Sequence, residues 1–276
     1  MKKRTCAALR FIGISVLLSL GGLAFAQSNE PILREERKIT VDGLEETWRL
    51  EWMNPPSPAC GPENDDYLTC PCRGFAFGEW GDLRLVRKRP GRKNEHFSLK
   101  PLFVHGDDLP KPYNAHGAVL RRWDVRDEDL KANDSPGFAD RVRRRPLSNI
   151  MNFADYDHDG RSTEFVLQIG TLPCGKGTSV VVGISRKNGR LHVFNSANRP
   201  NEPLILKTWQ WDALSNAKDS VKVNDWLCGD HGSNTYDEVE LRTDNGNIYA
   251  TRKTYECVDQ ANSKGARKHL IKKQDF

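Results

Sequence analysis

Three aspartates at alternate positions, followed at once by a glycine, carry the clearest chemistry in the sequence. They are Asp155, Asp157 and Asp159, and Gly160 follows them. Alternate spacing places three carboxylates on the inside of a tight loop, and the glycine permits a sharp turn that directs the carbonyl of Arg161 at the same centre. The pattern predicts a loop that wraps one hard cation. The alternative is an acidic turn that only faces solvent.

A fourth acid, Glu164, is predicted to close the shell around the ion. Ligands that are all oxygen favour calcium over zinc or copper. The predicted cofactor is therefore a structural calcium ion. Its expected ligands are Asp155, Asp157, Asp159, the backbone carbonyl of Arg161, and Glu164.

Residues 153–169 resemble the calcium loop of FG-GAP and VCBS-type repeat proteins. The Asp-x-Asp-x-Asp-Gly motif follows a short apolar element and precedes the strand-like run Glu164-Phe165-Val166-Leu167. In that family the loop joins strands of β-propeller blades and the ion is structural, which the resemblance implies here. The family has an acid at the ninth loop position, where this chain has Thr163. An EF-hand would need an acid at the position of Val166, so the EF-hand interpretation is rejected.

The first 26 residues predict a secretory signal peptide. Four basic residues (Lys2, Lys3, Arg4 and Arg10) precede an apolar run over residues 11–20. That run is shorter than the ~20 residues of a bilayer-spanning helix, and Ala24-Phe25-Ala26 predicts cleavage before Gln27. We therefore expect an exported protein that is periplasmic or extracellular.

The charge balance argues against nucleic-acid binding. Loss of the four basic residues of the signal lowers the formal net charge from +5 to +1. A mature chain so close to neutral lacks the basic footprint of a nucleic-acid-binding protein. No later run approaches the length of a membrane span. The expected partner is an unidentified ligand outside the cell or at its envelope.

The cysteines predict a disulfide framework. Cys6 leaves with the signal, and the six that remain are Cys60, Cys70, Cys72, Cys174, Cys228 and Cys257. An even number in an exported chain indicates disulfides. Three lie before residue 100 and three after residue 170, so complete pairing requires an odd number of bridges between the halves. A Cys70–Cys72 bridge would be strained. The alternatives are one or two free thiols, or zinc held by Cys60, Cys70 and Cys72.

Periodicity and turn signals predict a mainly β fold of antiparallel sheets, sandwich-like or partial-propeller-like, stapled by disulfides. Pro90-Gly91, Asn188-Gly189 and Asn245-Gly246 are expected turns. The candidate helix covers Leu204 to Leu214, where Trp209 and Trp211 alternate as they would on one face of a strand. The expected strands are Ile39 to Trp52, Leu83 to Val86, Ala118 to Trp123, Glu164 to Ile169, Thr178 to Ser185, Leu191 to Phe194, Val239 to Leu241 and Ile248 to Cys257.

Composition divides the mature chain into four parts. We expect an N-terminal β region with a Cys-rich loop (27–123), a charged linker or long loop (124–148), a C-terminal β region with the calcium loop (149–262), and a frayed basic tail (263–276). The two β regions can equally form one domain. The basic cluster Arg141 to Arg145 either docks on an acidic partner or is a solvated loop, and the small net charge favours the solvated loop.

The leading functional hypothesis is a non-catalytic calcium-binding protein with a structural or binding role at the envelope or outside the cell. The alternative is a secreted hydrolase that uses Asp230, His231 and Ser233 beside Cys228. A nucleophile also needs a base and an oxyanion hole supplied from elsewhere. His158, at the fourth position of the acidic loop, is expected to point into solvent.

Overall fold

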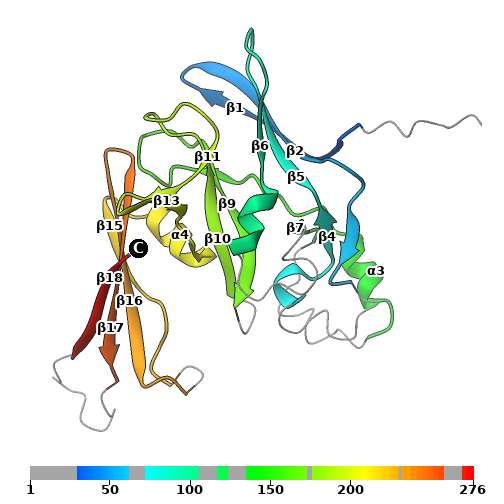
Figure 1. Ribbon diagram of the computed structural model, residues 1–276. Helices are drawn as coiled ribbons and strands as arrows, with labels where there is room; N and C mark the ends of the chain where they lie inside the picture. Colours follow the sequence, from blue (N-terminus) through cyan, green and yellow to red (C-terminus); the bar gives the residue numbers. More distant parts are fainter. Residues whose placement is uncertain are drawn as a thin grey trace, which may run out of the picture.

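The computed structural model describes residues 30–61, 72–105, 117–123, 135–172, 176–229, 232–257 and 269–276. The predicted signal peptide lies outside them. Within the described residues the fold is mainly β, as predicted, and is built of four sheets (Figure 1). Strand pairing is antiparallel except where Ser196 of β12 pairs with Ile248 of β17 in parallel.

The N-terminal part of the chain forms two sheets. The first sheet has the strand order β1-β2-β5-β6 and the small sheet has the order β3-β4-β7. The strands are β1 (Ile32–Val41), β2 (Leu44–Trp52), β3 (Ser57–Ala59), β4 (Gly78–Gly81), β5 (Leu83–Lys88), β6 (Glu95–Ser98) and β7 (Ala118–Arg121).

The C-terminal part forms the other two sheets. The central sheet has the order β11-β10-β9-β8, with β14 paired to β10, and the last sheet has the order β13-β12-β17-β16-β15, with β18 paired to β17. The strands are β8 (Phe153–Ala154), β9 (Glu164–Leu172), β10 (Lys176–Gly183), β11 (His192–Val193), β12 (Asn195–Ser196), β13 (Arg199–Pro203), β14 (Leu206–Lys207), β15 (Ser220–Asn224), β16 (Thr235–Asp244), β17 (Asn247–Glu256) and β18 (Leu270–Asp275).

Short helices complete the described fold. They are η1 (Cys72–Phe75), η2 (Lys100–His105), α3 (Phe138–Arg143) and α4 (Thr208–Ser215). In the described parts of the chain, no helix has both the length and the apolar character needed to cross a membrane.

The central sheet is buried on both faces. Phe165 and Leu167 of β9 point into a large core that also contains Trp48 of the first sheet. Val181 of β10 points the other way, into a second core with Trp211 of α4. Successive side chains of a strand alternate between faces, so one strand can serve both cores. The order of layers is the first sheet, the central sheet, then α4 with the last sheet (Figure 1), and the two predicted β regions share the large core.

The N-terminal strand prediction was correct in its alternation and wrong in its extent. Trp48, Leu50 and Trp52 are buried on one face of β2, as their period of two indicated. The expected single strand from Ile39 to Trp52 is interrupted by a turn at Asp42-Gly43, where φ is 50° and 81°. Asp-Gly is a preferred hairpin turn because both residues tolerate positive φ, and β1 therefore pairs back on β2.

Of the later hairpin signals, Asn245-Gly246 is confirmed: with φ values of 50° and 72°, it forms the turn that joins β16 to β17. Strand β10 also pairs with β11, as predicted, but neither Asn188 nor Gly189 has the positive φ expected of a two-residue turn, and the connection spans residues 184–191. The candidate helix is also present as α4. Trp211 in it is fully buried whereas Trp209 is 40% exposed, because residues two apart lie on different faces of a helix.

Two segments are more ordered than their composition suggested. Within the expected linker, α3 packs Phe138 and Val142 against Phe77, so this part is a packed helix. The expected frayed tail is wrong for residues 269–276, because β18 pairs with β17 and Phe276 packs beneath the guanidinium of Arg252 at 4.8 Å. Apolar side chains supply the anchoring contacts: Phe138 and Val142 in α3, and Phe276 after β18.

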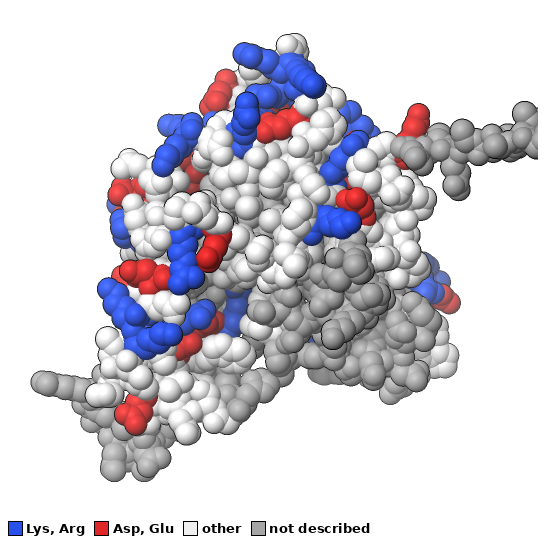
Figure 2. Space-filling view, in the orientation of Figure 1, with Lys and Arg blue, Asp and Glu red and all other residues white. Residues whose placement is uncertain are grey.

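Charged side chains on the described surface are mixed in sign. On the face drawn in Figure 2, lysines and arginines lie among acids along the upper and left edges. In the predicted basic cluster, Arg141 donates to the carbonyl oxygen of Pro136 at 2.9 Å and Arg143 pairs with Asp140 at 3.6 Å. Arg143 thus has an acidic partner nearby, whereas Arg141 is held by a neutral carbonyl and keeps its full charge.

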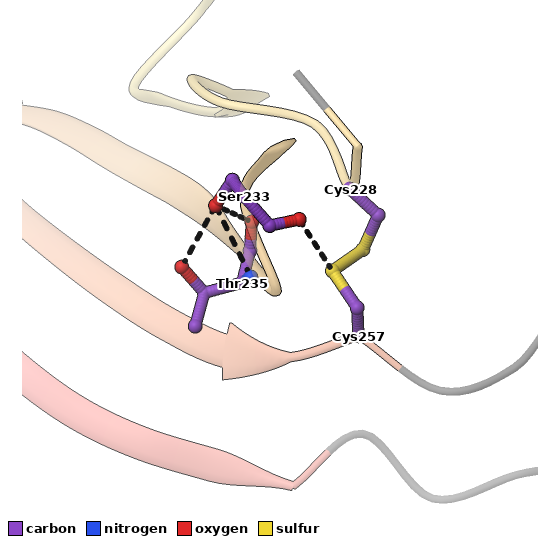
Figure 3. Close-up of a disulfide and its surroundings, with 4 residues drawn as sticks. All are labelled: Cys228, Ser233, Thr235 and Cys257. Atoms are coloured by element: carbon purple, nitrogen blue, oxygen red, sulfur yellow. Dashed lines mark hydrogen bonds between the residues drawn. A yellow bond between two sulfur atoms is a disulfide. The ribbon is translucent and has the colours of Figure 1, made fainter. Parts of the chain in front are cut away.

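Two disulfides confirm part of the predicted framework. Cys60 pairs with Cys72, and Cys228 pairs with Cys257 (Figure 3). The pairing of Cys60 with Cys72 contradicts the alternative of zinc bound by Cys60, Cys70 and Cys72. Each bridge lies within one half of the chain, and Cys70 and Cys174 lie outside the described residues.

The even number of cysteines predicts a third bridge. With two bridges formed, complete pairing leaves Cys70 and Cys174, one from each half. The flanking chains meet in the described structure, where Gln168 Nε2 donates to the carbonyl oxygen of Gly74 at 3.2 Å. We expect peptide mapping of the unreduced protein to recover a Cys70–Cys174 cross-linked peptide. Alkylation of both thiols in the denatured, unreduced protein would contradict this pairing.

Candidate metal centre

The acidic loop, residues 155–163, is the connection of a β-hairpin. It joins β8 to β9, which pair through Phe153 with Phe165 and Ala154 with Glu164. The Phe153 ring anchors the start of the loop, edge-on against Trp48 with ring centroids 5.3 Å apart. The loop is therefore fixed at both ends to the large core.

The structure brings the three predicted aspartates together. One carboxylate oxygen from each of Asp155, Asp157 and Asp159 lies within 4.8 Å of the others. The backbone N–H of Asp159 donates to Oδ1 of Asp155 at 3.0 Å and to Oδ1 of Asp157 at 3.1 Å, and the N–H of Gly160 donates to Oδ2 of Asp155 at 2.9 Å. Gly160 has a φ of 88°, so it supplies the predicted sharp turn.

Asp157 is the most deeply buried of the three carboxylates. It is fully buried, and its Oδ2 has no hydrogen-bond partner. The turn between β16 and β17 covers it, since a Cβ atom at Gly246 would lie 3.4 Å from this oxygen. Burial, followed by the charge of Asp159, raises the pKa of Asp157 from 3.8 to about 7. An unsatisfied buried polar group costs roughly 1–3 kcal/mol, so this carboxylate favours a proton or a cation.

Asp159 is balanced by an internal arginine. Its Oδ2 accepts hydrogen bonds from Nη2 of Arg161 at 2.9 Å and from the backbone N–H of Arg186 at 2.7 Å. Arg161 also reaches Oδ2 of Asp42, in the β1–β2 turn, at 3.2 Å. The bonds of Arg161 thus tie the acidic loop to another turn, and none of them reaches Oδ2 of Asp157.

Glu164, the predicted closing ligand, is not a member of the aspartate group. Its Oε2 accepts the backbone N–H of Tyr156 at 3.0 Å, and its Oε1 contacts the hydroxyl of Thr163. That hydroxyl also contacts the carbonyl oxygen of Ile184 at 2.9 Å. The Thr163 hydroxyl has a single proton, so it cannot donate to both oxygens. Both contacts are hydrogen bonds when Glu164 is protonated: the carboxyl O–H then donates to the Thr163 oxygen, and the Thr163 hydroxyl donates to the Ile184 carbonyl oxygen. Burial raises the pKa of Glu164 to about 9, which agrees with a protonated carboxyl at this position.

His158 does not point into solvent, so that prediction is wrong. Its Nε2 lies 3.1 Å from the carbonyl oxygen of Leu214 at the end of α4, and its Nδ1 lies 2.8 Å from the hydroxyl of Thr243 in β16. His158 has a φ of 55°, so its backbone adopts the left-handed conformation. The ring bridges two elements of the second core, and no local sequence signal indicated that contact.

The loop predicted for the alternative hydrolase is held by a disulfide, as Figure 3 shows. The carbonyl oxygen of Ser233 lies 4.0 Å from Sγ of Cys257, and the Ser233 hydroxyl donates to the carbonyl oxygen of Thr235 at 2.8 Å. Asp230 and His231 lie outside the described residues. The described contacts of Ser233 are those of a turn, so they give the hydrolase hypothesis no support.

Fold and site together define a mainly antiparallel β protein with two disulfides among its described residues and an acidic hairpin loop at the junction of its sheets. The chain matches no protein-family model, and no curated protein or solved structure is detectably similar to it.

Proposed function

We propose that this chain is an exported, non-catalytic protein whose acidic loop binds a structural calcium ion. Its role is structural or ligand-binding, at the cell envelope or outside the cell. The observation that carries the proposal is the fully buried Asp157 carboxylate, whose Oδ2 has no partner and sits in a group of three carboxylates. Clusters of acidic side chains are common on protein surfaces and do not by themselves indicate a metal site. A buried carboxylate oxygen without a hydrogen-bond partner, within such a cluster, needs a cation or a proton.

The donor set favours calcium among the available cations. Asp155, Asp157 and Asp159 offer only oxygen, which suits a hard cation. Calcium tolerates the irregular geometry of a short loop, whereas magnesium demands a near-ideal octahedron. Bound calcium would offset the charge at Asp157 and hold the loop against the β16–β17 turn, which packs on the same carboxylate. The resemblance to FG-GAP and VCBS-type loops supports the same role.

The rival explanation is that Arg161 replaces the ion. It pairs with Asp159 and Asp42 and so supplies one positive charge to the loop. Its hydrogen bonds leave Oδ2 of Asp157 unpartnered, which is the position where a cation would gain most. Arg161 therefore balances one carboxylate of the group and leaves the buried one unpaired.

Export is supported by two observations. The N-terminal residues have the pattern of a signal peptide. The disulfides Cys60–Cys72 and Cys228–Cys257 suit an oxidising compartment. Extracellular calcium is abundant enough to fill even weak, millimolar sites.

Thermal melting with calcium tests the proposal. An ion that binds only the folded state stabilises it by mass action, by about 2.7 kcal/mol at a free concentration of 100 times Kd. We expect millimolar calcium to raise the melting temperature of the chelator-treated protein by several degrees. Magnesium at the same ionic strength, the matched control, should raise it far less. No rise with calcium, or equal rises with both ions, would contradict the proposal.

The stabilisation by calcium should depend on pH. Between pH 3.8 and about 7 the metal-free folded chain keeps a proton on Asp157 that the unfolded chain releases. Through this group, the stability of the metal-free protein falls as pH rises across that window. Calcium must displace the proton, so its apparent affinity should fall by up to about tenfold per pH unit below 7. A calcium-induced rise in melting temperature that is as large near pH 5.5 as near pH 8 would contradict this prediction.

A further inference from the structure

A second feature beside the acidic loop is a pocket of about 370 Å³. Three turns meet there: the β10–β11 turn, the β12–β13 turn and the β16–β17 turn, which is the orange turn of Figure 1. Its polar and aromatic lining includes Lys187, Asn188, His192, Phe194, Asn195 and Asn247. None of the described lining residues is acidic.

An aromatic pair forms one wall of the pocket. The rings of His192 and Phe194 lie 4.4 Å apart with an interplanar angle of 33°. Phe194 is buried, and Nδ1 of His192 lies 3.0 Å from the carbonyl oxygen of Arg190, which fixes the ring. Phe194 thus backs the His192 ring at a tilt, and the part-buried, positioned His192 ring is the surface that the pair can offer to the C–H face of a sugar ring.

Amide side chains supply the hydrogen-bonding groups. Nδ2 of Asn195 donates to the carbonyl oxygen of Pro200 at 2.8 Å, and Nδ2 of Asn247 donates to that of Asp244 at 3.1 Å. Each amide is therefore held by its own turn. The oxygen of Asn195 is available to accept a bond from a ligand, whereas that of Asn247 already accepts one from Nζ of Lys187 at 3.4 Å. Asn188 adds an exposed amide with one acceptor and two donor hydrogens.

We propose that this pocket binds a neutral saccharide. Amides match hydroxyl groups, which both donate and accept, and the His192–Phe194 wall matches the apolar face of a sugar ring. A strongly anionic ligand would need more than Lys187, whose Nζ is shared with Oδ1 of Asn247 at 3.4 Å. An apolar ligand would leave the amides unpaired, at a cost. Without a pair of carboxylates in the described lining, the pocket binds a glycan and does not cleave it.

The pocket shares two of its turns with the acidic loop. Arg186, next to Lys187 in the β10–β11 turn, donates its backbone N–H to Asp159 at 2.7 Å. Gly246, in the β16–β17 turn, packs against Asp157. Resting on the proposed function, this arrangement implies that calcium holds both turns in place, so saccharide affinity falls several-fold when calcium is removed.

The test uses the mature full chain and a defined panel of ligands. The panel comprises glucose, galactose, mannose, N-acetylglucosamine and their short oligomers, with galacturonate and inorganic phosphate as anionic members. Titration calorimetry should show binding of at least one neutral member. His192→Ala and Asn188→Ala should each weaken that binding by roughly tenfold. Asn224→Ala, an exposed asparagine at the end of β15, is the matched control and should bind as wild type does.

Three results would overturn the saccharide proposal: no binding by any neutral member, binding of galacturonate or phosphate alone, or neutral binding unchanged in both pocket variants. Asn188→Ala alters only an exposed side chain, so misfolding cannot explain a loss of binding in that variant. The calcium proposal is tested separately, by the effect of calcium on the melting temperature. Saccharide binding with no calcium response would remove the coupling and leave the pocket proposal standing.

Discussion

Replacing Asp157 with asparagine should shift stability in opposite directions with and without calcium. In the metal-free protein near pH 8 the substitution removes a buried, ionised and unpartnered carboxylate. We expect it to stabilise the protein by about 1–3 kcal/mol, the usual cost of such a group. In calcium the same substitution removes an ion ligand, so the calcium-induced rise in melting temperature should disappear.

Asp155→Asn is the informative comparison. Both oxygens of Asp155 accept backbone N–H groups, from Asp159 and Gly160, and an amide nitrogen cannot accept. This variant should therefore lose the calcium response and also lose stability in the metal-free protein. Asp219→Asn, at an exposed site, should change neither quantity. If Asp157→Asn destabilises the metal-free protein, or keeps the calcium response, Asp157 does not have the role proposed here.

Replacing Arg87 with methionine should cause the largest loss of stability. Its side chain is 4% exposed and pairs with Glu46 through two bonds, of 2.6 and 2.8 Å. It also donates to the carbonyl oxygen of Gly189 at 2.8 Å, which joins the first sheet to the β10–β11 turn. Removing one partner of a buried ion pair leaves the other uncompensated, which costs about 3–5 kcal/mol.

Denaturant unfolding of matched variants measures this effect. Lys38→Met breaks the exposed pair with Glu45, and we expect a cost of at most about 1 kcal/mol. Adding Glu46→Leu to Arg87→Met should recover much of the lost stability, because the uncompensated charge is then gone. If Arg87→Met and Lys38→Met lower the free energy of unfolding by the same amount, the buried pair contributes no more to stability than the exposed one, which would contradict this prediction.

Local patterns in the sequence were sufficient to predict the β16–β17 hairpin and the clustering of the three aspartates in the acidic loop. Asn245-Gly246 predicted a turn because both residues tolerate positive φ, and the alternation of Trp48 and Trp52 predicted a buried face. Asp42-Gly43 is a signal of the same kind, and it marks the turn that divides the expected first strand into β1 and β2. Three aspartates at alternate positions similarly indicated one cluster of oxygen ligands.

Contacts between residues distant in the sequence could not be predicted. His158 is held by Leu214 and Thr243, and Asp157 is covered by Gly246, through packing that no local pattern encodes. Arg87 finds Glu46 only because β2 and β5 become neighbours. Cysteine parity likewise constrained the number of bridges between the halves without identifying the pairs that form.

The most direct test of the calcium site is a crystal structure of the mature protein grown with calcium, with terbium as an anomalous substitute. We expect one ion bound by oxygens of Asp155, Asp157 and Asp159 at about 2.3–2.6 Å, and no ion there in crystals of Asp157→Asn. Crystals soaked in terbium that show no anomalous peak beside these three aspartates would contradict the account.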